Sequence, residues 1–387
     1  MIEPAVSSLS RPRGDALAVP VVILIGAIFG ACQGLSYPLF SLILARQGFD
    51  SAVIGLNSAM TPLGIVLAAP LLPVVTRRLG SAATALCGAV LLAVTLLMLG
   101  AVQHIWFWFP GRFLLGAAIC GLYVTSETWI NVLVEPARRG RMLGLFTSML
   151  AFGFAIGPFI LVATGSVGWP PFLALSSIVL VAAILIVAVY RALPEFRASE
   201  GGSVRGFVRL APLLLGVVLA VAAFDQAVLS LFPVYATGKG FDERDIALAI
   251  SVWAAGNVLF QLPIGWLSDH WSQRGTTLLL CLITIAGAAS LPFVMHARWL
   301  FWPILFVWGP ASYGVYTVAL IELGSRFSGS ALLAGNSAFA IMWGVGGMIG
   351  PSILGALMDQ VGPEGLPAGL CIVYAALMAA VWWRRDA

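Results

Sequence analysis

The chain consists largely of apolar stretches, each about as long as a lipid bilayer is thick. Charged residues fall mostly in the short segments between these stretches. A helix of about 20 apolar residues crosses a bilayer, and a chain that is 60% hydrophobic and 9% charged could not hide so much apolar surface in water. We therefore predict an all-α membrane protein with twelve transmembrane helices. The expected spans are approximately 18–44, 51–76, 81–102, 105–134, 139–163, 170–192, 209–237, 243–268, 274–295, 299–323, 329–357 and 365–384.

The second half of the chain repeats the first half. When it is shifted back by 193 positions, identical residues coincide. The matching pairs are Gln33 and Gln226, Pro70 and Pro263, Gly116 and Gly309, Gly121 and Gly314, Tyr123 and Tyr316, and Gly157-Pro158 and Gly350-Pro351. A Gly-Phe-Asp turn also recurs, at 48–50 and 240–242. Such repeats are typical of transporters in which two halves move around a site between them.

The repeat predicts two pseudo-symmetric six-helix bundles with a connection between them. We expect an N-terminal tail at 1–17, a first bundle at 18–192, a linker loop at 193–208, and a second bundle with a short tail at 209–387. The linker region contains Pro194, Glu195, Arg197, Glu200 and two glycines. Residues of these types are typical of a flexible connection.

The distribution of basic residues predicts the orientation in the membrane. If both termini are cytoplasmic, cytoplasmic segments hold fifteen arginines, whereas the outer loops hold only Arg46, Lys239, Arg244 and Arg298. Cytoplasmic loops of membrane proteins carry an excess of Lys and Arg. We therefore predict a multi-pass protein of a bacterial inner membrane with cytoplasmic termini.

The expected span 105–134 carries a polar stripe. Arg112, Gly116, Tyr123 and Glu127 fall at about 0°, 40°, 20° and 60° around the helix, over roughly 22 Å of its length. Such a stripe faces protein or water and not lipid. We expect a cavity wall in which Glu127 carries protons and Arg112 tunes it or binds substrate. The alternative is that Glu127 is a fixed structural partner of an Arg or a backbone group.

A second acidic residue lies near the middle of the expected seventh span. Asp225 is next to Gln226, while its repeat partner is Cys32, so the scaffold is shared and the charge is not. Intramembrane charges are costly, roughly 2.5–3.5 kcal/mol each on insertion scales, and often functional. We predict that Asp225 takes part in proton coupling or substrate binding, although a structural hydrogen bond to a neighbouring helix would also explain it. Gln33 and Gln226, which occupy matching positions in the two halves, could equally form hydrogen bonds between helices.

Other polar and aromatic residues are candidates for the cavity wall or for gates. The expected substrate-binding residues are Gln33, Tyr37, Tyr123, Gln226, Asn257, Tyr316, Asn336 and Trp343, although aromatic residues at such positions commonly serve packing. The expected gating residues are Asp269, Arg274, Glu135, Arg139, Glu322 and Arg326. Glu135 and Arg139, and Glu322 and Arg326, have the i, i+4 spacing of helix-end ion pairs, which is an equally simple explanation.

Several motifs resemble those of the major facilitator superfamily. The loop Gly265-Trp-Leu-Ser-Asp269-His-Trp-Ser-Gln-Arg274 resembles its loop signature, and the equivalent Pro73–Gly80 is degenerate. Arg112-Phe-Leu-Leu-Gly116 resembles an element linked to proton coupling. Gly144, Gly153, Gly157 and Pro158 resemble an antiporter signature, and Gly346, Gly350 and Pro351 repeat its end. Gly111-Arg112-Phe113, Ser126-Glu127, Arg139-Gly140-Arg141 and Pro263-Ile264-Gly265 resemble the YcaD-type bacterial branch.

The resemblance implies a secondary active transporter and not an enzyme. We expect proton-coupled antiport that exports a small organic molecule by alternating access, with helix bends at the Gly-Pro pairs, no cofactor, no metal and no nucleic-acid partner. The alternatives are proton-coupled uptake of a nutrient or siderophore-like solute, and a non-transporting assembly or sensor protein. The protein is expected to be a monomer in the bilayer. The acids favour a cationic substrate, whereas Arg112 would suit an anion.

Overall fold

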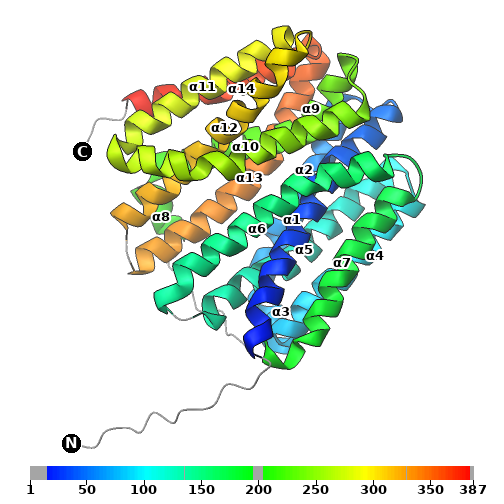
Figure 1. Ribbon diagram of the computed structural model, residues 1–387, viewed down its shortest axis with the longest axis vertical. Helices are drawn as coiled ribbons and strands as arrows, with labels where there is room; N and C mark the ends of the chain where they lie inside the picture. The colour runs from blue at the N-terminus through cyan, green and yellow to red at the C-terminus, as the bar shows by residue number, and fades with distance from the viewer. Residues whose placement is uncertain (1–14, 135, 195–203, 328, 384–387) are drawn as a thin grey trace, which may run out of the picture.

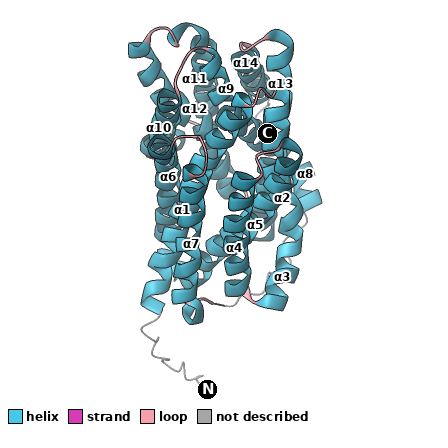
Figure 2. Cartoon of the chain, turned by 90° about the vertical axis from the view of Figure 1, so that its right-hand side faces the viewer, coloured by secondary structure: helices cyan, strands magenta, loops and turns pink. Residues whose placement is uncertain are grey.

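The computed structural model describes residues 15–134, 136–194, 204–327 and 329–383. Within these ranges the regular structure is entirely helical (Figure 2). The α-helices are α1 (Asp15–Arg46), α2 (Ser51–Ala68), α3 (Leu72–Leu79), α4 (Ser81–Ala101), α5 (Ile105–Leu133), α6 (Pro136–Thr164), α7 (Pro170–Ala188), α8 (Val204–Leu210), α9 (Pro212–Gly238), α10 (Glu243–His270), α11 (Gln273–Val294), α12 (Arg298–Arg326), α13 (Gly329–Val361) and α14 (Gly365–Trp383), with short 3₁₀ helices η1 (Ala69–Leu71) and η2 (Tyr190–Ala192).

In the described part of the chain, twelve helical segments are long and apolar enough to cross a membrane, so the predicted all-helical, twelve-span fold is confirmed. The second span joins α2, η1 and α3 into one stretch, Ser51–Leu79. Helices are expected in an apolar environment, because each helix satisfies its own backbone hydrogen bonds. The range expected as a linker loop, 193–208, includes the start of α8, where Phe207 packs against Phe327 at a ring distance of 5.1 Å.

The helices pack as two groups (Figure 1). In the first, α1 lies against α6 and α7, and α5 lies between α2 and α4. In the second, α9 lies against α13, and α12 lies between α10 and α11. We call α1–α7 the first half and α8–α14 the second half. The two halves touch mainly through α2 with α13, through α6 with α10, and through α1 with α9.

The sequence repeat produces the same local structure twice. Gly48 and Gly240 both have a φ of 82°, a backbone conformation that suits glycine. In each turn the amide of the following phenylalanine bonds back over five residues, Phe49 to Leu44 and Phe241 to Ala236. This is the Schellman arrangement, which ends a helix by satisfying its last carbonyls. The two Gly-Phe-Asp turns therefore end α1 and α9 in the same way.

Glycines allow equivalent helix pairs to approach closely in the two halves. A methyl group on Gly153 of α6 would lie 1.9 Å from the carbonyl oxygen of Ala27 in α1. A methyl group on Gly350 of α13 would lie 2.1 Å from the carbonyl oxygen of Ala223 in α9. Small residues at membrane helix contacts permit this approach. Gly157 and Gly346 make similar contacts, Pro158 and Pro351 lie within their helices, and the surroundings of Gly144 fall outside the described part.

The spans alternate in direction, so the helix ends gather on two faces. On the face where α1 begins and α14 ends, which we call the terminal face, Arg274 at the start of α11 donates to the carbonyl oxygen of Trp382. On the other, the opposite face, α1 ends and α2 begins, and Lys239 after α9 pairs with Glu364 before α14. These contacts fix which helix ends lie together.

Candidate functional site

The two halves are joined on the opposite face by a carboxylate that caps a helix of the other half. Asp359, near the end of α13, accepts hydrogen bonds from the backbone amides of Ser51 at 2.9 Å and Ala52 at 2.8 Å, which begin α2. Asp50 occupies the N-cap position of α2, but its side chain makes no capping hydrogen bond. A carboxylate at a helix start satisfies free amides and complements the helix dipole. Asp359 therefore stabilises α2 and the joint between the halves together.

An ion pair joins the halves beside this cap. Arg46 at the end of α1 lies 3.0 Å from the Glu243 carboxylate at the start of α10. Arg46 also bonds to Ser166, between α6 and α7. Both charged side chains are about two-fifths exposed, 42% and 41%. An exposed pair of this kind contributes at most about 1 kcal/mol.

Close backbone contact continues inward from the opposite face. A methyl group on Gly55 of α2 would lie 2.0 Å from the carbonyl oxygen of Pro351 in α13, and one on Gly344 would lie 2.2 Å from Val66. Between α10 and α6, the Ser251 hydroxyl donates to the carbonyl oxygen of Ala155 at 3.1 Å. These hydrogen bonds and the ion pair, all between described residues of the two halves, lie toward this face. The interface is therefore closed on the opposite face.

Glu127 lies at the part of the interface nearer the terminal face. Its side chain is exposed, although much protein surrounds it. Tyr123, one turn earlier on α5, stacks on Phe29 of α1 at a ring distance of 4.6 Å. Tyr316 of α12, in the other half, lies within electrostatic range of Glu127. Glu127 is thus an exposed carboxylate on the side of α5 that lies toward the second half.

Arg112 has different surroundings, although it belongs to the same predicted stripe. Its side chain is 1% exposed and donates to Asn57, Ser58 and Thr61 of α2, each at 3.3 Å. The guanidinium also lies over the Phe40 ring, 5.0 Å from its centre. Arg112 therefore makes hydrogen bonds to α2 and a cation–π contact with α1. At this depth α2 covers the stripe, so Arg112 holds helices together within the first half.

Asp225 is buried where α1 of the first half meets α9 of the second half. It is 8% exposed, and its described hydrogen-bond partner is the amide nitrogen of the adjacent Gln226 side chain, at 3.4 Å. No basic side chain in the described part of the chain forms an ion pair with it. Tyr37 of α1 and Tyr313 of α12 lie within electrostatic range of Asp225. The carboxylate therefore lies near tyrosines of both halves.

The mirrored glutamines lie at the same crossing. The Gln33 side chain is hydrogen-bonded to Tyr37. The side-chain oxygens of Gln33 and Gln226 are buried and have no hydrogen-bond donor among the described residues. Buried polar atoms are nearly always bonded, so an orphan acceptor calls for an explanation such as a ligand or water. The crossing therefore holds, beside the Asp225 carboxylate, two acceptor oxygens that have no donor among the described residues.

Aromatic rings occupy the space between the two acidic residues. Tyr316 contacts Trp343 at 5.1 Å and Phe339 at 6.2 Å, and Tyr313 contacts Trp343 at 5.9 Å. Tyr313 lies in range of Asp225, and Tyr316 lies in range of Glu127. The tyrosine pair on α12 thus links the surroundings of the two carboxylates. Tyr313, Phe29 and Phe339 were not among the sequence candidates, and only the i, i+3 spacing of Tyr313 and Tyr316 indicated the first of them.

The two asparagine candidates have different surroundings. Asn257 on α10 accepts a hydrogen bond from Gln261 at 3.3 Å, and Gln261 accepts one from Thr317 on α12. This chain of hydrogen bonds joins two helices of the second half. Asn336 on α13 is exposed, and Trp343, two turns along the same helix, is half-buried. Asn336 is thus accessible, whereas Asn257 already has a partner within its half.

The predicted gating residues lie at helix ends on the terminal face. Glu322 and Arg326 of α12 form an ion pair at 2.7 Å. Arg274 lines the same cavity as this pair, and Asp269, at the end of α10, is exposed and has no hydrogen bond or ion pair in the part of the chain that is described. Glu135 and the side chain of Arg139 lie outside the described residues. Among described residues, no group of three His, Cys, Asp or Glu could hold a metal ion.

Twelve spans in two similar halves, with carboxylates at the interface, define a multi-pass membrane protein with the architecture of a secondary transporter. A sequence model of the Major Facilitator Superfamily matches residues 22–331, and the chain belongs to this family.

Two relatives and two solved structures illustrate the similarity. The chain is 27% identical to "Uncharacterized MFS-type transporter YfkF" of Bacillus subtilis, over 86% of each chain. It is 24% identical to "Uncharacterized MFS-type transporter YcaD" of Escherichia fergusonii, over 88% of this chain and 89% of the relative. Among solved structures, a mutant of the nucleoside transporter NupG superposes with a TM-score of 0.80 at 15% identity, covering 95% of this chain and 99% of NupG. A bacterial homologue of the human lysosomal transporter Spinster, inward-facing and unoccupied, gives 0.73 at 14% identity, covering 96% and 95%. At these identities the structures show a shared fold alone.

Proposed function

We propose that the protein is a proton-coupled antiporter that exports a small organic cation by alternating access. The observation that carries the proposal is the set of acceptors at the α1–α9 crossing. The Asp225 carboxylate has no basic partner among the described residues, and the oxygens of Gln33 and Gln226 have no described donor. A buried charge is costly unless it is paired. A proton or a bound cation would relieve that cost.

Arg112 would be the natural residue for binding an anionic substrate, but it is covered by α2 and nearly inaccessible. Glu127, the exposed charge within the spans, has the opposite sign. The rings of Tyr123, Tyr316 and Trp343 lie near it. Aromatic faces attract cations, so the surroundings favour a protonated amine with an apolar body. Amine N–H groups would also supply the donors that the two glutamine oxygens need.

Antiport follows if one carboxylate serves both partners. A carboxylate that holds a proton is neutral and does not attract a cation, so proton and substrate exclude one another at Asp225. Glu127, at the accessible part of the interface, would exchange protons with the side to which the terminal face opens. The excess of arginines at that face supports the assignment of the terminal face to the cytoplasm of a bacterial inner membrane. We infer a monomer, because each chain contains both halves of the interface.

The test uses purified protein in liposomes with a pH-sensitive dye trapped inside. Primary, secondary and tertiary amines would be compared with quaternary ammonium ions of similar shape and with acids and sugars. We expect amines to drive proton movement, quaternary ions to act more weakly because they lack N–H donors, and acids and sugars to do nothing. Glu127→Gln and Asp225→Asn should abolish the response, whereas Asp50→Asn, an exposed acid, should keep it.

The direction of proton movement separates the proposal from its alternatives. Protons that move against the amine support antiport, whereas protons that move with it would show uptake by symport. A response to acids with none to amines would overturn the proposed substrate class. Binding of amines without any flux would support a sensor.

A further inference from the structure

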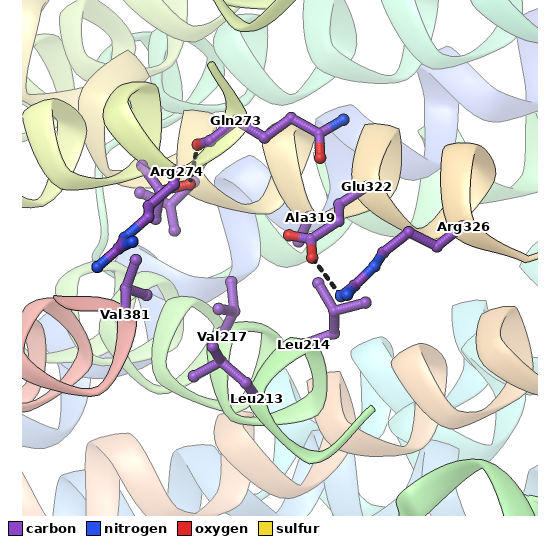
Figure 3. Close-up of a pocket in the computed structure, with 11 residues that line it drawn as sticks. Leu213, Leu214, Val217, Gln273, Arg274, Ala319, Glu322, Arg326 and Val381 are labelled. Carbon is purple, nitrogen blue, oxygen red and sulfur yellow. Dashed lines mark hydrogen bonds and ion pairs between the residues drawn. The ribbon is translucent and has the colours of Figure 1, made fainter. Parts of the chain in front are cut away.

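A cavity lies inside the second half, away from the interface between the halves. Its volume is about 210 Å³, and it lies between α9, α11, α12 and α14 at the terminal face (Figure 3). Its apolar wall is formed by leucine and valine side chains such as Leu213, Leu214, Val217 and Val381. Its polar side is formed by Gln273, Arg274, Glu322 and Arg326. The cavity therefore has one apolar side and one charged side.

The charged side carries two guanidinium groups and one carboxylate. Arg326 donates from one terminal nitrogen to Glu322 at 2.7 Å, and Arg274 donates to the carbonyl oxygen of Trp382 at 2.6 Å. A guanidinium has five N–H donors, and Arg326 uses one of them on described residues. Its side chain is 42% exposed. The lining has a net positive charge and a donor group that is accessible to a ligand.

The cavity lies at the depth of the lipid headgroups. Gln273 begins the ninth span, Arg326 ends the tenth, and Val381 is near the end of the twelfth. Span ends mark the boundary between hydrocarbon and water. Phosphate groups are the abundant anions at this level, and basic pockets between membrane helices are known to hold them.

We propose that this cavity binds a phosphate group carried on an apolar body, and that an anionic phospholipid supplies it. Arg326 and Arg274 would hold the phosphate, because guanidinium groups form strong charge-assisted hydrogen bonds with phosphate oxygens. The leucines and valine of α9 would cover the first atoms of the acyl chains. Glu322 would keep Arg326 oriented. The site is formed by helices of one half only, so it does not depend on the proposed transport function.

Native mass spectrometry of the detergent-solubilised full chain tests the proposal with three matched probes. Phosphatidylglycerol carries phosphate and acyl chains, diacylglycerol lacks the phosphate, and glycerol 3-phosphate lacks the chains. We expect phosphatidylglycerol to bind and the other two to bind at least about tenfold more weakly, since a hydrogen bond to a charged group contributes enough for that difference.

Two variants and one control make the test specific. Arg326→Gln should weaken phosphatidylglycerol binding about tenfold, and Ala319→Leu should weaken it by filling the cavity. Arg298→Gln changes an arginine that is 67% exposed on the opposite face and should leave binding unchanged. Equal weakening by all three variants, or none by the first two, would overturn the site. Binding of glycerol 3-phosphate as strong as that of the lipid would overturn the lipid as the source of the phosphate.

Discussion

The two halves of the molecule share their packing residues and differ in the charges that lie within their spans. Gly157 of α6 and Gly350 of α13 are repeat partners, and each sits against the backbone of its neighbouring helix, α1 or α9. The charged residues within the spans, Arg112, Glu127 and Asp225, have no such counterparts. At the repeat position of Asp225 stands Cys32, at that of Glu127 stands Leu320, and at that of Arg112 stands Leu305.

This difference has a physical basis. Close helix packing is needed in each half, because each bundle must hold together by itself. A buried charge is expensive wherever it is placed, and two acids at symmetric positions would repel one another at the α1–α9 crossing. The packing is therefore duplicated, whereas each charge within the spans is present once.

The largest effect is expected from the charge that only the second half has. Asp225→Asn should reduce amine-driven proton movement about thirtyfold or more, because the proposed ion pair between this carboxylate and a bound amine would lose one partner, which costs about 2–5 kcal/mol. Cys32→Ala, at the repeat position in the first half, should leave transport unchanged. Dye-loaded liposomes give both rates. Equal losses in the two variants would show that the crossing is sensitive to packing and not to charge.

The shared glycines should respond alike. Gly157→Ala and Gly350→Ala introduce methyl groups that would lie 2.5 Å and 2.1 Å from backbone atoms of α1 and α9. Overpacking of this kind costs about 1–3 kcal/mol, so both variants should unfold at lower temperature in detergent. Gly216→Ala on α9 has nothing within 4 Å and should be neutral or slightly stabilising. A drop in only one of the two glycine variants would mean that the halves are not equivalent in packing.

The joint between the halves can be weakened at the α2 cap. Asp359→Ala should lose about 1 kcal/mol of capping and shift the population about fivefold toward molecules that open on the opposite face. Spin labels at Arg78 and His270, on the terminal-face ends of the two halves, should move closer. Asp50→Ala provides the matched control, since Asp50 makes no capping bond. An identical distance distribution in all three proteins would exclude the cap as a determinant of conformation.

The smallest effect is expected from the exposed ion pair. Arg46→Gln should change the free-energy difference between the two conformations by less than about 1 kcal/mol, which the same distance distribution reports. The change should become smaller at high salt because salt screens exposed charges. Arg298 pairs with Asp245 at 2.8 Å within the second half, so Arg298→Gln should not shift it. If both variants shift it equally, general surface charge matters more than the link between halves.

The spans could be predicted from the sequence because they depend on long apolar patterns, and the repeat because identical residues coincide at one constant shift. Neither depends on the details of packing. The stripe on α5 also predicted that Glu127 and Tyr123 share a side of that helix. The separate surroundings of Arg112 could not be predicted in this way. Helical angles show which residues share a side of a helix, but they do not show which neighbour covers that side at each depth.

The capping role of Asp359 could not be predicted from the sequence either. Asp50 stands at the expected N-cap position of α2, and sequence rules select it. The bond goes instead to a residue 308 positions away from Ser51, because the folded chain brings the end of α13 beside the start of α2. The cavity between α9, α11, α12 and α14 likewise depends on the fit of four helices.

The glycine contacts also determine how motion passes through the molecule. Helices whose backbones touch have no side chains that could yield between them, so α1 with α6 and α9 with α13 form stiff beams. In the proposed alternating access, the α1–α9 crossing near Gln33 and Gln226 would be the point about which these helix pairs tilt. From Gln226 to the start of α9 the lever is about 21 Å long, and a tilt of about 15°, similar to the subunit rotation in haemoglobin, would move its end by about 5 Å. With stiff helices of this length, loss of the two hydrogen bonds of Asp359 on the opposite face would allow a displacement at the terminal face that is as wide as a small amine.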